Sequence, residues 1–79
     1  MSAIILDGLD SAIVGFTTET EPRAVYDSDK ILAILMDRDG MTEEQAIDYY
    51  EYNIEGGYLG EGSPLFIRVM TLEEFEEML

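Results

Sequence analysis

The clearest local signal in the chain is the sequence GMTEEQAIDYYEYNIEGG, residues 40–57. Thr42 followed by Gln45 matches a capping box, in which the two side chains bind the free backbone N–H groups at the start of a helix. The pair Gly56-Gly57 is typical of a helix end, since glycine adopts a positive φ at no steric cost. The stretch therefore predicts a helix that begins after Thr42 and runs to about Glu55.

Apolar residues recur along this helix at the spacing of one face, and we expect Ala46, Ile47, Tyr50 and Ile54 to point inward. A second helix is expected just before it. Asp27 or Ser28 can cap that helix, Ile31 and Leu35 lie in its apolar stripe, and Gly40 ends it. Because the connection is short, residues 28–55 are expected to form an αα-hairpin.

The rest of the chain has the character of short strands. Residues 3–6 are expected to form a strand or arm, residues 12–26 a β-hairpin, and residues 65–69 a third strand. Thr71 and Glu74 form a second capping box, which opens a short C-terminal helix with Leu72, Phe75 and Leu79 facing inward. The expected fold is α+β, with a small antiparallel three-stranded sheet packed against the αα-hairpin and a short C-terminal helix.

Length and composition exclude several classes of protein. With 79 residues, 47% of them hydrophobic, the chain is expected to be one folded domain spanning residues 1–79. It contains neither cysteine nor histidine, which excludes disulfides, thiolate metal sites and any nucleophile paired with a histidine base. We therefore expect a protein that is not an enzyme and needs no cofactor. Its apolar runs are too short for a membrane anchor.

Charge narrows the choice of partner. The chain has 18 acidic and 4 basic residues, for a formal net charge of −14. Nucleic acids and anionic membranes attract clustered Lys and Arg, so direct binding to either is not expected. The expected partner is a basic protein surface, reached by electrostatic steering that weakens as salt is added. A homodimer and a monomer both remain open.

The candidate recognition residues lie on the second helix. Glu44, Asp48, Glu51 and Glu55 follow spacings of four, three and four, which places them on one helix face. Like charges at these spacings repel each other, so a row of them without interspersed lysines is consistent with a surface presented to a cationic partner. An ordinary solvated face of an acidic protein is the competing interpretation.

Two tyrosines flank this row. Tyr49 and Tyr52 lie partly outside the inward stripe, and exposed tyrosines are enriched among the residues that dominate binding energy at interfaces. Together with the acids they predict a docking surface. The alternative is that both rings cover the seam between helix and sheet.

A small-ligand pocket is a second hypothesis. It would lie between the loop of residues 56–64 and the second helix, with Asn53, Tyr58 and Glu61 as ligand-binding residues. Asn53 is expected near the inward side, where a buried amide needs hydrogen-bond partners. The glycines of this loop do not form a phosphate loop, because no lysine follows them and Glu61 would repel phosphate.

About half the chain resembles a group of small acidic proteins encoded by tailed bacteriophages. The matching residues are Tyr26-Asp27, Lys30-Ile31, Leu35, Gly40 to Ala46, Tyr50 to Asn53, Gly57-Tyr58, Gly60-Glu61 and Pro64 to Phe66. The resemblance implies production in the cytoplasm of an infected bacterial host, where such proteins commonly bind and inhibit host machinery. It carries over no catalytic residue.

Charge and resemblance together give the functional expectation. We expect a non-enzymatic binding module that inhibits a host protein by presenting an acidic helix face. That face would act as a nucleic-acid mimic, and the host protein would be one that handles nucleic acid or serves in defence. The alternatives are a protein that sequesters a nucleotide-like ligand and an accessory in phage assembly.

Overall fold

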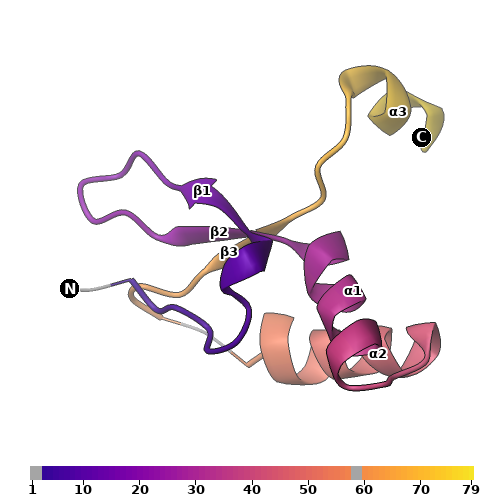
Figure 1. Ribbon diagram of the computed structural model, residues 1–79. Helices are drawn as coiled ribbons and strands as arrows, with labels where there is room; N and C mark the ends of the chain where they lie inside the picture. The colour runs from indigo at the N-terminus through magenta and orange to yellow at the C-terminus, as the bar shows by residue number, and fades with distance from the viewer. Residues whose placement is uncertain (1–2, 58–59) are drawn as a thin grey trace.

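The structure is a computed structural model that describes residues 3–57 and 60–79. It has the α+β architecture expected from the sequence, with helices packed against a three-stranded sheet of order β1-β2-β3 (Figure 1). In chain order the elements are a 3-10 turn η1 (Asp10–Ala12), β1 (Ile13–Phe16), β2 (Ala24–Asp27), α1 (Ser28–Arg38), α2 (Glu43–Tyr49), a π-helix η2 (Tyr50–Glu55), β3 (Leu65–Ile67) and α3 (Leu72–Glu77).

The sheet is mixed, which corrects the expectation of an antiparallel one. Strands β1 and β2 form the predicted antiparallel hairpin, but β3 runs parallel to β2, with Val25 opposite Leu65 and Tyr26 opposite Phe66. Parallel neighbours need a long crossover connection. Here α1, α2 and η2 supply it: β2 leads directly into α1, and the chain returns to the start of β2 before β3 begins.

The predicted helix starts are confirmed. The side chain of Asp27 accepts hydrogen bonds from the backbone N–H groups of Asp29 and Lys30, at 2.9 and 3.3 Å. Thr42 and Gln45 form the capping box of α2, and Thr71 and Glu74 form that of α3. Each cap satisfies backbone donors that have no partner within the helix, so the local sequence fixes where these helices begin.

The second helix reaches Glu55 as predicted but changes type on the way. From Tyr50 it is a π-helix, in which each turn takes in about one additional residue. The glycines at its end are not needed for a positive φ, because the φ of Gly56 is −84°. A Cβ on Gly56 would lie 2.8 Å from the carbonyl oxygen of Glu51, and one on Gly57 would lie 2.7 Å from that of Asn53. Close approach of the backbone explains both glycines.

The core lies between the sheet and the helices. The ring of Phe66 on β3 stacks on Tyr26 of β2, with centroids 5.9 Å apart, and meets Tyr50 edge-on at 5.7 Å. The buried residues are Leu6, Leu9, Ala12, Ala24, Tyr26, Ile31, Leu35, Ala46, Tyr50 and Ile54. Ile47 was expected among them but remains 38% exposed at the edge of the core.

The N-terminal segment forms an arm packed against this core. Its buried residue Leu6 donates its backbone N–H to the hydroxyl of Tyr26 at 2.8 Å, and Ile4 donates to the carbonyl of Gly62 at 2.9 Å. The guanidinium of Arg38, at the end of α1, donates to the carbonyl of Gly8 at 3.0 Å. These bonds tie both ends of the arm to elements far along the chain.

The C-terminal helix contradicts its predicted packing. Its residues Leu72 and Phe75 are 72% and 49% exposed, and Leu79 beyond it is also exposed. Figure 1 shows α3 standing away from the body at the end of an extended segment. The prediction failed because an apolar stripe shows which face of a helix needs cover but not what covers it. Within the described ranges, no helix is long and apolar enough to cross a membrane.

Candidate functional site

The four acids predicted for recognition on the second helix form no ion pair within the described part of the chain. The three arginines contact other acids: Arg23 pairs with Glu19 and Arg38 with Asp39, each at 2.9 Å, while Arg68 lies 3.6 Å from Asp29. In the described part of the chain, no cation is within ion-pair distance of Glu44, Asp48, Glu51 or Glu55. The arginines of the chain therefore leave these four carboxylates without an ion-pair partner.

Half of the predicted docking residues surround one groove. Asp48 and Tyr49 from α2 and Tyr52 from η2 line an open hollow of about 510 Å³, together with Met41, Gln45 and Asn53. Tyr49 is 42% exposed and Tyr52 is 80% exposed. We call this hollow the tyrosine groove. Its two aromatic rings and the thioether offer apolar contact area, with the Asp48 carboxylate beside them.

The other predicted acids do not share this groove. Glu51 and Glu55 line a second hollow of about 360 Å³ that faces β3, where Tyr50, Phe66 and Arg68 also lie. Glu44 is exposed one turn before Asp48 on α2. A continuous α-helix would align all four acids, but the wider turns of η2 displace the later positions relative to those on α2. The acids therefore occupy two flanks of one helical segment.

Glu55 is engaged within the second hollow. Its Oε2 accepts a hydrogen bond of 3.2 Å from the hydroxyl of Tyr50. Burial, and then the nearby negative charge of Glu55, raises the pKa of Tyr50 well above its ordinary value. Tyr50 is thus a protonated donor that fixes the Glu55 side chain, which makes Glu55 less available to a partner than Asp48.

Two residues of the tyrosine groove were missed by the sequence analysis. Met41 and Gln45 line it, although the sequence analysis gave Gln45 only a capping role and Met41 none. A signal for them was present: Met41 comes just before the cap Thr42, and Gln45 is the capping-box partner of Thr42. The capping residues thus also form one wall of the groove.

Asn53 and Glu61, two of the three residues proposed for a small-ligand pocket, are not brought together. Asn53 is exposed and lies at the tyrosine groove, which corrects the expectation of a buried amide. The extra residue in each π-helical turn places it outside the inward stripe. Glu61 lines a different hollow, and Tyr58 falls outside the described residues.

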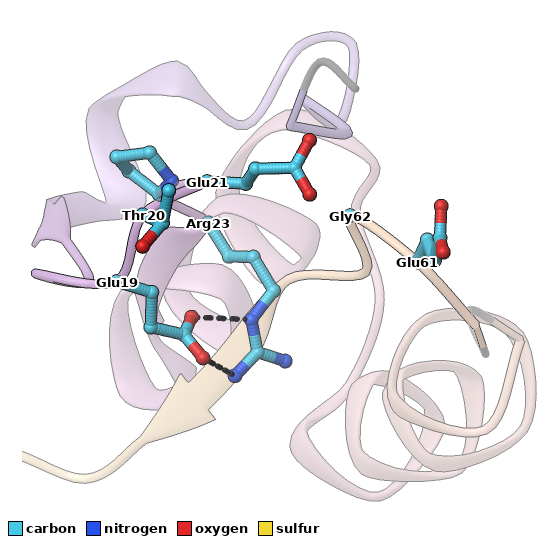
Figure 2. A pocket seen from close by; sticks show the side chains of 7 residues that line it. Glu19, Thr20, Glu21, Arg23, Glu61 and Gly62 are labelled. Atoms are coloured by element: carbon cyan, nitrogen blue, oxygen red, sulfur yellow. Dashed lines mark hydrogen bonds and ion pairs between the residues drawn. The ribbon is translucent and has the colours of Figure 1, made fainter.

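The hollow at Glu61 has its own chemistry. It measures about 280 Å³ and is lined by Glu19, Thr20, Glu21, Pro22, Arg23, Glu61 and Gly62. Figure 2 shows the guanidinium of Arg23 turned toward Glu19, to which it donates from Nε at 2.9 Å and from Nη2 at 3.3 Å. The pKa of Glu19 is lowered by this contact. Because the cation is already paired, the hollow offers little attraction for a phosphate group.

The features that the site offers to a ligand or partner are aromatic surface and negative charge. Across residues 3–57 and 60–79, no three acidic side chains gather closely enough to hold a metal ion. The tyrosine groove instead combines exposed aromatic surface with unpaired negative charge.

Comparison of the chain with protein-family models, with curated proteins and with solved structures gives no match.

Proposed function

We propose that this protein is a non-enzymatic binding module that docks the tyrosine groove, with the adjoining acids Glu44, Asp48 and Glu51, onto a basic surface of another protein. The single observation that carries the proposal is the groove itself, in which Asp48 lies beside two exposed tyrosines. Tyrosine supplies large and rigid contact area, while the carboxylates supply long-range attraction to cations.

The resemblance to small acidic phage proteins supports a bacterial host protein as the partner. A host protein that handles nucleic acid, including one that does so in defence, carries a basic surface for phosphates. Occupying that surface would inhibit it by steric and electrostatic competition. The net charge of −14 supports the same choice, because it steers the chain toward positive potentials and away from nucleic acid itself.

The test is a charge reversal with a matched control. Glu44 and Asp48 are the second and sixth residues of α2, whose cap is Thr42, and Glu73 and Glu77 hold the same positions in α3 after its cap Thr71. The pairs Glu44→Lys/Asp48→Lys and Glu73→Lys/Glu77→Lys therefore change net charge equally, at the same spacing and at the same distance from a capping box.

Both variants and the wild type would be used to capture proteins from bacterial lysate at low and high salt. We expect the wild type and the α3 variant to retain the same basic protein at low salt, and the α2 variant to lose it. Equal loss by both variants would reduce the interaction to bulk charge and refute a specific surface. Retention by the α2 variant would refute the proposed site.

A further inference from the structure

Besides the tyrosine groove, the described part of the chain leaves two further apolar surfaces uncovered. The first is one face of α3, where Leu72 and Phe75 lie one turn apart and Met78 follows at the same spacing. All three are exposed, whereas Glu73 and Glu77 lie on the opposite face. A helix of six residues is not stable in water by itself. The well-formed capping box therefore begins a helix that needs a surface to pack against.

The second uncovered surface is the outer face of the sheet. Tyr26 and Phe66 face the core, so their neighbours along the strands, Val25, Leu65 and Ile67, point to the other side. Leu65 and Ile67 are 38% and 40% exposed. Val14, which lies where the register between β1 and β2 shifts, is also exposed. The helices pack on the inner face, which leaves Leu65 and Ile67 partly exposed on the outer one.

The accessible surface area of the chain is larger than that of a compact monomer of the same mass. The chain exposes 5575 Å², whereas a compact monomer of 8.9 kDa exposes about 4800 Å². Its radius of gyration is 13.4 Å, compared with about 11.6 Å for a compact domain of this length. The excess of roughly 800 Å² is the area that one partner contributes to an interface of standard size.

We infer that this protein forms a homodimer by exchange, in which α3 of each copy packs its Leu72 and Phe75 face on the outer sheet face of the other. A second copy is the occupant because both complementary surfaces lie on the same chain. The segment of residues 68–71 also carries α3 away from its own sheet (Figure 1). A two-fold exchange covers both helices and both sheets at once, so neither of these two surfaces is left open to extend the assembly.

Added salt should affect the dimer and the proposed docking to a basic partner in opposite directions. Each copy carries a net charge of −14, so the two copies repel each other. Added salt screens this repulsion and should strengthen the dimer, whereas it should weaken docking to a basic partner. The exchange also uses the face of the sheet opposite the helices, so the tyrosine groove stays free. Either proposal can therefore fail without the other.

Sedimentation equilibrium at low and at moderate salt tests whether the dimer forms. We expect wild-type dimers that tighten as salt is added, and a loss of affinity of about 100-fold or more in Leu72→Ser/Phe75→Ser, since both side chains would lie at the centre of the interface. Circular dichroism checks that the body of the variant stays folded. A wild type that is monomeric at every concentration, or a dimer unaffected by the variant, overturns the inference.

A disulfide test identifies which surfaces meet. Because the chain has no cysteine, Ile67→Cys and a size-tagged Phe75→Cys can be mixed and oxidised, with Glu73→Cys as the control on the polar face of α3. We expect a crosslink between the tagged and untagged chains that the control does not form. In the double variant Ile67→Cys/Phe75→Cys, a disulfide within one chain would show that α3 folds onto its own sheet and would overturn the exchange.

Discussion

The hydroxyl oxygen of Tyr26 accepts the backbone N–H of Leu6 at 2.8 Å inside the core, across twenty residues of sequence. The variant Tyr26→Phe would leave that buried N–H without a partner. We expect the free energy of unfolding to fall by about 1–3 kcal/mol, as measured by urea denaturation. The control is Tyr52→Phe, since the Tyr52 side chain is largely exposed, and it should change stability by less than about 0.5 kcal/mol. Equal stability of the two variants would contradict a structural role for the buried bond.

Because the backbone approaches Gly56 closely, we expect alanine there to lower stability, whereas helix propensity alone would predict that alanine raises it. Alanine normally stabilises a helix relative to glycine, but a Cβ at Gly56 would lie 2.8 Å from the carbonyl oxygen of Glu51. We expect Gly56→Ala to destabilise the protein by about 1–3 kcal/mol. Thermal denaturation should show this loss, while Gly15→Ala, which meets nothing within 4 Å, should be nearly neutral. A stabilised Gly56→Ala would show that the π-helical end is not held as described.

The buried hydroxyl of Tyr50 predicts a loss of stability in alkali. Burial and the Glu55 carboxylate raise the pKa of Tyr50 in the folded state, while in the unfolded chain it stays near 10. The folded state therefore keeps a proton that the unfolded state gives up, and the free energy of unfolding should decline as the pH rises above about 10. Denaturation of the wild type and of Tyr50→Phe across this range isolates the effect. A difference between them that does not change with pH would contradict it.

The exposed ring of Tyr52 predicts a separation of binding from stability. Because the side chain is 80% exposed, we expect Tyr52→Ala to alter the free energy of unfolding by less than about 0.5 kcal/mol. Its loss from the tyrosine groove should still weaken partner binding by about tenfold or more, if it acts as a typical interface tyrosine. Calorimetric titration with the captured partner measures this, and Tyr52→Phe serves as the conservative control. Unchanged affinity of the alanine variant would remove Tyr52 from the docking surface.

Features set by local chemistry could be predicted from the sequence. Thr42 and Gln45 specify the start of α2 wherever the helix packs, and their spacing alone identified it. For α1 the sequence offered Asp27 or Ser28 as the cap, and Asp27 is the one used. The β1–β2 hairpin was also predicted, since its strands are neighbours in the chain. In the candidate site, the juxtaposition of Asp48, Tyr49 and Tyr52 follows directly from helical spacing.

Features that depend on distant contacts could not be predicted. The direction of β3 is set by where the crossover returns the chain, and a strand of three residues carries no signal of whether its neighbour is parallel. The π-helix at Tyr50 likewise has no mark in the sequence, yet it separates Glu55 from Asp48 and exposes Asn53. The stripe of Leu72 and Phe75 was recognised, but its position outside the body was not.

The parallel pairing of β3 with β2 has a consequence for the order of folding. The hairpin and the two helices can form early through local contacts, but the ring of Phe66 reaches Tyr26 only after a loop of forty residues has closed. Closing a loop of that length costs chain entropy before any contact compensates for it. We therefore expect the docking of β3 to be the late, slow step of folding, and the aromatic core to be completed only when this short strand takes its place.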